Sequence, residues 1–235
     1  MITCPGCGAE NPDGHRFCGQ CGAALAAPPP IAEERKVVTT LFCDIVGFTA
    51  MSEVADPEDI DALLRRYAEA ARRVIQSHGG TVEKFIGDAV VGVFGVPAVH
   101  EDDPERAVRA GLRLIEALDG LRRPDGAALE VRVGVNTGEA LVRLDVDLHS
   151  GRGFLTGDAV NVAARLQAAA PPNGVAVGAL THELTISAIE YENLLPVAAK
   201  GKREPVVAYR ALRPFARTGL RTTGQTAAPF LGRAG

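Results

Sequence analysis

The sequence predicts an α+β protein whose main part is a ferredoxin-like βαββαβ core with additions, preceded by a small cysteine-rich module. The patterns from residue 35 onward follow the order strand, helix, strand, strand, helix, strand. Hydrophobic residues make up 46% of the 235 residues, which is enough to build a core. Four of the five cysteines lie within the first 21 residues, before a proline-rich stretch.

The first half of the core is expected to hold one helix and three strands. The helix has an N-cap and a first-turn proline at Asp56-Pro57, apolar side chains at helical spacing, and a stop at Gly79. A tight turn at Gly87 indicates a hairpin. The expected strands are residues 37–43, with buried Cys43, and the hairpin strands 81–86 and 89–94.

The second half is expected to continue with two longer helices and several strands. One helix opens at Asp103-Pro104, and another spans residues 156–169. Residues 129–135 predict a strand that pairs with residues 140–146. The remaining expected elements are a short helix near Ala179 and strands at 175–177, 186–191 and 206–212.

Changes in composition divide the chain into four segments. We predict a zinc ribbon at 1–25, a proline-rich linker at 26–34, the folded core at 35–213 and a flexible C-terminal linker at 214–235.

The N-terminal cysteines have the spacing of a metal site. Cys4 and Cys7 form one Cys-x2-Cys pair, and Cys18 and Cys21 form a second after ten intervening residues. Four thiolates suit one tetrahedral Zn²⁺, which would supply the folding energy that so short a segment lacks, about 10–16 kcal/mol in zinc-finger peptides. An iron site or redox dithiols are the alternatives. His15 is expected to be a solvated loop residue.

Charge and hydropathy exclude several function classes. The formal net charge of −4 offers no electrostatic basis for binding nucleic acid over a broad surface. No apolar run reaches the roughly 18 residues that span a bilayer, and the N-terminus lacks a secretory signal. We therefore expect a cytoplasmic protein with no membrane contact. Only Arg16 adds basic charge to the ribbon, which favours a protein partner or a regulatory role for it.

Two aspartates are placed where strands end. Asp44 follows the first strand directly, and Asp88 lies in the hairpin turn. In a βαββαβ sheet the first strand lies beside that hairpin, so the carboxylates are expected to meet at one edge and to bind divalent cations. The turn over residues 45–49 contains a glycine and is expected to offer backbone N–H groups to phosphates. Taken singly, each Asp is better explained as a turn residue or helix cap, so the metal-site interpretation depends on the two residues together.

A polar pair interrupts the apolar helix expected at 156–169. Asn161 and Arg165 are four residues apart and therefore project from one face. A solvated helical face is the alternative interpretation.

Four segments together resemble class III adenylate and guanylate cyclases. They are residues 41–49, 82–89, 157–166 and 200–202, and the resemblance covers about residues 35 to 213. It implies synthesis of cyclic AMP from ATP with release of pyrophosphate. It also implies two Mg²⁺ or Mn²⁺ ions held by Asp44, Asp88 and the carbonyl of Ile45, with substrate contacts from the turn residues Phe48 and Thr49.

The resemblance assigns the remaining roles to side chains that contact ATP. Lys84 would reach the adenine, Asn161 would orient the ribose, Arg165 would stabilise charge on the α-phosphate, and Lys200 would contact the triphosphate.

The same resemblance implies a homodimer with two equivalent sites. Asp44, Asp88 and Lys84 would face Asn161 and Arg165 across the interface, so a monomer would have no complete site.

One position departs from the family pattern. A polar residue seven positions before the Asn helps to read adenine in this family, and here that residue is Phe154. Thr156 is the candidate substitute if the preceding loop, 145–153, shifts the register. Lys84 still favours adenine, because guanine-specific members carry an acid there.

The order of ribbon and cyclase resembles a bacterial arrangement that continues into a P-loop ATPase. Residues 228–233 are similar to the start of such an ATPase, so we expect the chain to be a fragment with a missing C-terminal partner module. Two alternatives remain: a catalytically weak cyclase-fold module for dimerisation or nucleotide sensing, and a nucleic-acid-binding or adaptor protein led by the ribbon.

Overall fold

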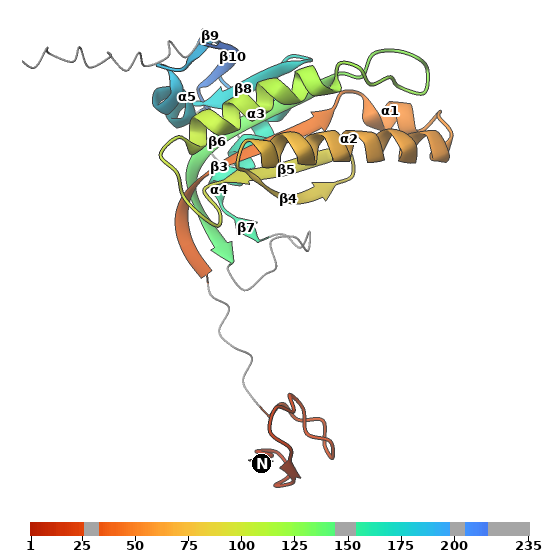
Figure 1. The fold of residues 1–235 in the computed structure, drawn as a ribbon, viewed down its shortest axis with the longest axis vertical. Coiled ribbons are helices and arrows are strands. Elements are labelled where there is room, and N and C mark those ends of the chain that lie inside the picture. Colours follow the sequence, from red (N-terminus) through yellow and green to blue (C-terminus); the bar gives the residue numbers. More distant parts are fainter. Residues whose placement is uncertain (26–32, 144–153, 198–204, 216–235) are drawn as a thin grey trace, which may run out of the picture. The chain divides into compact units, whose positions relative to one another are not determined.

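The computed structural model describes residues 1–25, 33–143, 154–197 and 205–215 (Figure 1). The chain divides into two compact units, Met1–Ala32 and Glu33–Gly235. Lys200, the loop 145–153 and residues 228–233, all used above, lie outside the described residues.

The first unit is built from two similar turns. Strands β1 (Ile2–Thr3) and β2 (Glu10–Asn11) pair antiparallel. Gly8 donates its amide to the Cys4 carbonyl at 2.9 Å, and Gly22 does the same to Cys18 at 2.9 Å. Both glycines have positive φ, 76° and 74°, which an L side chain rarely adopts. The glycine after each cysteine pair therefore lets the chain turn around the sulfurs.

The second unit is one mixed sheet with helices on both faces. Among the described residues the sheet has eight strands, in the order β4-β5-β3-β6-β8-β10-β9, with β7 beside β6. The strands are β3 (Glu33–Ile45), β4 (Thr81–Ile86), β5 (Ala89–Phe94), β6 (Val131–Arg143), β7 (Leu155–Thr156), β8 (Gly174–Gly178), β9 (Ile189–Asn193) and β10 (Ala208–Pro214). The helices are α1 (Phe48–Ser52), α2 (Pro57–Ser77), α3 (Asp103–Leu118), α4 (Asp158–Ala169) and α5 (Ala179–Thr185).

Alternation along β6 shows which helices cover which face. Val131, Val133 and Val135 are buried in the large core under α2 and α3 (Figure 1). Gly134, between them, faces α4, and a Cβ there would lie 2.2 Å from the Ala163 carbonyl oxygen. α4 therefore rests directly on the sheet backbone, on the face opposite α2 and α3.

Several predicted elements are confirmed. α2 begins at Pro57 and ends before Gly79, whose φ is 81°. The hairpin strands have the predicted bounds, with a positive φ at Gly87. Cys43 is fully buried and His15 is exposed, as expected.

The hairpin predicted over residues 129–146 is wrong. β6 is a single strand from Val131 to Arg143 and pairs with β3 throughout. The polar residues in the middle of this strand find partners on the helices that pack against it: Asn136 Nδ2 donates to the Ala159 carbonyl at 3.1 Å, and Thr137 Oγ1 lies 3.0 Å from Thr181 Oγ1.

Several other element boundaries differ from the predicted ones. The helix predicted from residue 156 begins at Asp158, because Leu155–Thr156 form β7 against β6. The first core strand begins at Glu33, inside the predicted linker, and α1 was not predicted. The last strands lie at Ile189–Asn193 and Ala208–Pro214, slightly later than expected.

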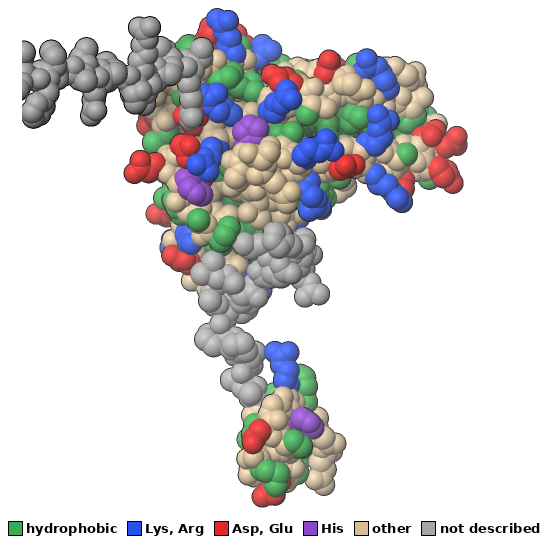
Figure 2. Space-filling view, viewed as in Figure 1, with side chains coloured by type: hydrophobic (Ala, Val, Ile, Leu, Met, Phe, Trp, Pro, Cys, Tyr) green, Lys and Arg blue, Asp and Glu red, His purple; other side chains and the backbone are tan. Residues whose placement is uncertain are grey.

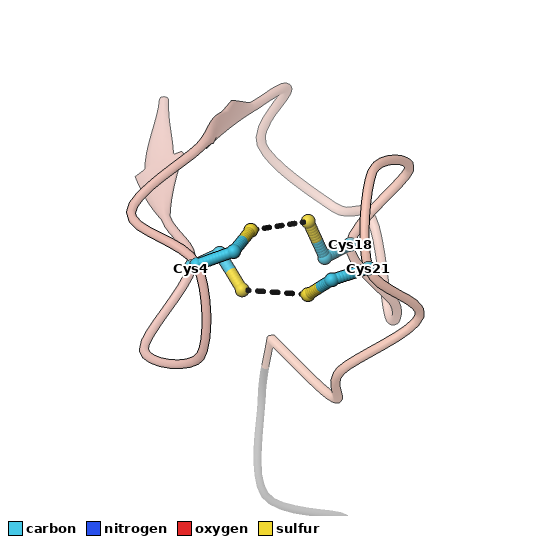
Figure 3. A group of neighbouring side chains, drawn as sticks. Cys4, Cys18 and Cys21 are labelled. Atoms are coloured by element: carbon cyan, nitrogen blue, oxygen red, sulfur yellow. Dashed lines mark hydrogen bonds between the residues drawn. The ribbon is translucent and has the colours of Figure 1, made fainter.

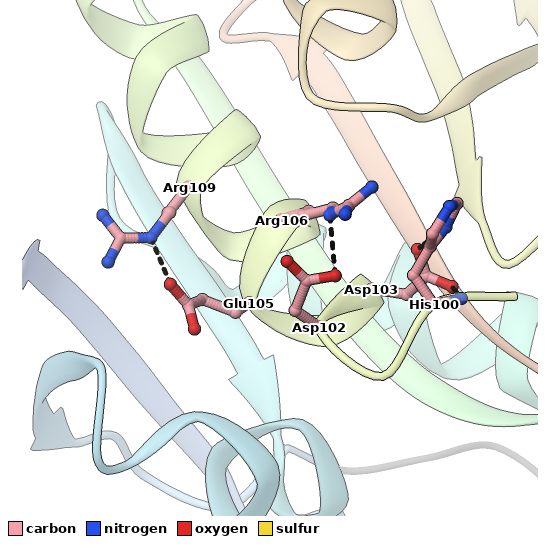
Figure 4. A network of polar contacts seen from close by, with 6 residues as sticks. All are labelled: His100, Asp102, Asp103, Glu105, Arg106 and Arg109. Carbon is pink, nitrogen blue, oxygen red and sulfur yellow. Dashed lines mark hydrogen bonds and ion pairs between the residues drawn. The ribbon is translucent and has the colours of Figure 1, made fainter. Parts of the chain in front are cut away.

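Polar contacts fix the start of α3 where Asp103-Pro104 predicted it (Figure 4). The buried Asp103 carboxylate accepts the His100 amide at 2.7 Å. Two ion pairs lie beside it, Asp102–Arg106 and Glu105–Arg109, and in each the partners are four residues apart.

The surface seen in Figure 2 mixes charges of both signs, with Lys and Arg side chains scattered among Asp and Glu. None of the helices in the described part of the chain is long and apolar enough to cross a membrane.

Candidate functional site

The two predicted carboxylates meet at the end of β3. β3 pairs with β5, with Cys43 opposite Val90, so the hairpin turn carries Asp88 to the side of Asp44. Burial raises the pKa of Asp88 to about 7, and the neighbouring Asp44 carboxylate adds to this shift.

A hollow of about 380 Å³ opens at these carboxylates. Two adjacent acidic groups that repel each other fit a divalent cation, whose charge would relieve that repulsion. The hollow is lined by Asp44, Ile45, Val46, Gly47, Phe48, Thr49, Ala50, Asp88, Arg132 and Gln167.

The turn after Asp44 leads into α1. Gly47 has a φ of 70° and precedes the helix, which begins at Phe48. The first amides of a helix have no intrahelical acceptor, so those of Phe48 and Thr49 are available to anions at the hollow.

The sequence analysis missed two polar residues of the hollow. Arg132 lies opposite Asp44 in the pairing of β3 with β6, and its buried Nε has no hydrogen-bond partner among the described residues. Gln167 donates from Nε2 to Asp44 Oδ2 at 3.4 Å. A charged residue within an apolar strand was the available signal for Arg132. Gln167 had none, because its contact depends on how α4 packs.

The predicted pair on α4 lies apart from the carboxylates. Asn161 is exposed and Arg165 is half-buried, and neither lines the hollow. Within one chain the structure therefore does not bring Asn161 and Arg165 to Asp44 and Asp88.

Lys84 also lies away from the hollow. Its Nζ is 3.3 Å from Glu83 Oε1, and the same oxygen accepts the Leu155 amide of β7 at 3.4 Å. Thr156, the neighbour of Leu155, is exposed, whereas Phe154 is only 1% exposed and packs in an apolar cluster. Lys84 is thus linked to β7 through Glu83, and Phe154 is part of the hydrophobic core.

The four N-terminal cysteines converge on one point (Figure 3). The sulfurs lie within 4.8 Å of one another, with Cys4–Cys21 at 3.5 Å and Cys7–Cys18 at 3.6 Å. Sulfurs about 2.3 Å from a tetrahedral Zn²⁺ lie about 3.8 Å apart, so the cluster fits zinc.

Neighbouring N–H groups stabilise the thiolate of Cys18. The amides of Gln20 and Cys21, with the Asn11 side chain, lower the pKa of Cys18 to about 6. Asn11 is buried; its Nδ2 donates to Cys18 Sγ at 3.6 Å and its Oδ1 accepts the Gly19 amide at 3.0 Å.

Comparisons with known proteins agree with this architecture. Residues 31–210 match the adenylate and guanylate cyclase catalytic domain, and residues 3–25 match a zinc-ribbon domain. Adenylate cyclase 1 of Rhizobium meliloti (strain 1021) is 30% identical over 185 residues, covering 76% of this chain and 28% of that protein. The chain spans well under half the length of the first curated relatives it matches.

Solved structures of both substrate types are similar. The adenylyl cyclase CyaB from P. aeruginosa has a TM-score of 0.69 at 29% identity, covering 78% of this chain and 97% of that one. The guanylate cyclase domain of RhGC from Catenaria anguillulae, in complex with GTP, has a TM-score of 0.70 at 25% identity, covering 77% and 99%. With the paired carboxylates at the end of β3 and the four-cysteine cluster, these matches show that the chain belongs to the class III adenylate and guanylate cyclase family and carries an N-terminal zinc-ribbon domain.

Proposed function

We propose that this chain is an adenylate cyclase that converts ATP to 3′,5′-cyclic AMP and pyrophosphate at sites shared between two copies. The hollow that joins Asp44 and Asp88 to Arg132 is the observation that carries the proposal. It offers adjacent anionic and cationic groups, which a metal–triphosphate substrate requires.

The carboxylates and the arginine have different roles at the phosphates. Asp44 and Asp88 would hold two Mg²⁺ or Mn²⁺ ions, which would favour ionisation of the ribose 3′-hydroxyl and neutralise charge on the phosphates. Arg132 binds phosphate oxygens from the neighbouring strand, and the amides of Phe48 and Thr49 add further donors.

The reaction forms one bond and breaks one. The ribose 3′-oxygen bonds to the α-phosphorus after losing its proton, and the bond from that phosphorus to the bridging oxygen of pyrophosphate breaks in line. Arg165 stabilises the charge that develops on the α-phosphate, and Asn161 holds the ribose.

A second copy completes the site. Asn161 and Arg165 do not line the hollow of their own chain, and the Asn161 side chain is exposed on α4. A twofold dimer that brings α4 of one copy to the hollow of the other creates two equivalent sites.

The base is read on the α4 side of this interface. Lys84 is linked through Glu83 to β7, which leads directly into α4. We therefore assign Lys84 and Thr156 to the copy that supplies Asn161 and Arg165, whereas the family resemblance had grouped Lys84 with Asp44 and Asp88. Lys84 donates to adenine N1, an acceptor, while the N1 of guanine is a donor.

The test is cyclic nucleotide formation by the purified chain, with ATP and GTP supplied separately and Mg²⁺ or Mn²⁺ present. We expect cyclic AMP as the main product and a loss of at least about a hundredfold in Asp44→Ala, because one metal ligand is removed. No product from either nucleotide, in a sample shown to be dimeric and folded, would contradict the proposal.

The second candidate function is a nucleotide-sensing module without turnover. The buried, apolar Phe154 favours it, because this side chain cannot hydrogen-bond the exocyclic amine of adenine. That function predicts ATP binding and dimers in the same assay, with no cyclic product.

A further inference from the structure

Glu83 is a buried acid next to the proposed base-reading lysine. Its side chain is 1% exposed, whereas that of Lys84 is 32% exposed. Oε1 lies 3.3 Å from Lys84 Nζ and accepts the Leu155 amide at 3.4 Å. Oε2 is buried and has no hydrogen-bond partner in the described part of the chain. A buried carboxylate is costly unless a positive charge compensates it, and within the described residues Lys84 is the charged group shown in contact with Glu83.

A β-bulge makes this contact between neighbouring residues geometrically feasible. In a regular strand, adjacent side chains point to opposite faces. The pairing of β4 with β5 shifts between Val82, opposite Gly92, and Lys84, opposite Val91, so Glu83 is the extra residue. Such bulges re-aim side chains beside functional sites. Here the bulge allows the carboxylate of Glu83 to approach the ammonium of Lys84.

The same carboxylate connects two strands that each carry a base-reading candidate. Lys84 is on β4, and Leu155 on β7 precedes the exposed Thr156. β4 and β7 are not neighbours in the sheet, since β7 pairs with β6. Through one oxygen, Glu83 therefore sets the position of Lys84 relative to Thr156.

We infer that Glu83 is a positioning residue for purine selection: it orients Lys84 and fixes its spacing to Thr156, so that the pair matches adenine. The inference rests on the proposed function and deepens it. Glu83 itself is buried and touches no substrate. Its loss would free the half-exposed Lys84 side chain, which weakens the contact to adenine N1 and leaves the reacting phosphates unaffected.

The test compares Glu83→Gln with the parent chain. Glutamine keeps the size of the side chain and its acceptor for the Leu155 amide, but it removes the charge that holds Lys84. We expect the KM for ATP to rise about tenfold, with kcat within about twofold of the parent and a lower ratio of ATP to GTP turnover. The matched control is Glu69→Gln, which removes an exposed acid paired with Arg73 and should change neither parameter.

A double-mutant cycle separates positioning from a structural role. In a Lys84→Met background, Glu83→Gln should not change the KM for ATP further, because the residue it acts through is gone. Equal effects of Glu83→Gln in both backgrounds, or no change in the parent background, would overturn the inference while cyclase activity stands. A parent chain that neither turns over nor binds ATP would instead contradict the proposed function, and the inference would fall with it.

Discussion

At the scale of single residues, the central feature is the pair of acids at the end of β3. Asp88 is partly buried beside Asp44, so its ionised form is disfavoured and its pKa rises to about 7 from an ordinary 3.8. Without a cation, ionisation of Asp88 above pH 7 therefore makes the free energy of folding less favourable. Such an unfavourable pair of carboxylates is expected in a site that binds a divalent metal, because the cation would compensate the two negative charges.

This cost predicts how Asp88→Asn changes stability. Between pH 4 and 7 the folded metal-free chain binds a proton at Asp88 that the unfolded chain does not, so the parent gains stability as pH falls through about 7. Asp88→Asn should raise the melting temperature of the metal-free chain at pH 8, with little difference near pH 4, and should abolish cyclic nucleotide formation. Calorimetry in EDTA measures this, with exposed Asp119→Asn as the control. A lower melting temperature at pH 8 would contradict the argument.

Asn11 is expected to tune zinc binding without touching the metal. Its amide donates to Cys18 Sγ and accepts from Gly19, which orients a ligand. Loss of such an outer contact typically costs 10–100-fold in metal affinity. Asn11→Ala should therefore weaken zinc binding by roughly tenfold or more. Competition with a chelator of known affinity measures it. Asp13→Ala, at an exposed site, is the control, and equal affinity in the two variants would disprove the role.

Residue-level reasoning from sequence found the acids but not their surroundings. Asp44 and Asp88 were predictable because each ends a strand whose pairing follows from the topology. The cysteine cluster was predictable from spacing alone. Glu83 and Gln167 were not, because one depends on a bulge and the other on helix packing.

At the scale of elements, the position of α4 decides the geometry of the site. Gly134 lets the helix approach the sheet, since a Cβ there would lie 2.2 Å from both the Ala163 oxygen and the Gln167 nitrogen. Gln167 in turn contacts Asp44. The spacing between helix and strand is therefore set by one glycine.

Gly134→Ala should push α4 away from the sheet. Overpacking of this kind costs about 3 kcal/mol of unfolding free energy when backbone atoms must move. Activity should also fall, because Asn161 and Arg165 move with the helix. Urea unfolding measures the loss, with Gly120→Ala, whose added Cβ would meet nothing within 4 Å, as the control. Equal stability of both variants would show that α4 does not rest on this position.

Elements that begin or end at a proline or glycine were predicted well, because these residues have strong backbone preferences. Pro57 and Gly79 bound α2, and Gly87 forms the hairpin turn. The continuous β6 was missed because Asn136 and Thr137 resemble turn residues. Their side chains are satisfied by contacts to α4 and α5, which are distant in sequence.

At the scale of the whole molecule, mixing two variants tests which copy of the dimer supplies each side chain to a site. If Lys84 belongs with α4, Lys84→Met mixed with Asp44→Ala should regain ATP turnover at ATP concentrations well below the KM of Lys84→Met, because one site of the mixed dimer receives neither change. Lys84→Met mixed with Arg165→Ala should not regain it, since both changes fall on the same side. The opposite result would support the grouping of Lys84 with the metal carboxylates.

The most direct test of the shared site mixes Asp44→Ala with Arg165→Ala. Each variant alone should be inactive, because every site of its dimer lacks one essential group. Random pairing makes half of the dimers mixed, each with one intact site of two, so the mixture should recover about a quarter of the parental cyclic AMP formation. A mixture that stays inactive although mixed dimers are present, beside an active parent, would contradict the account.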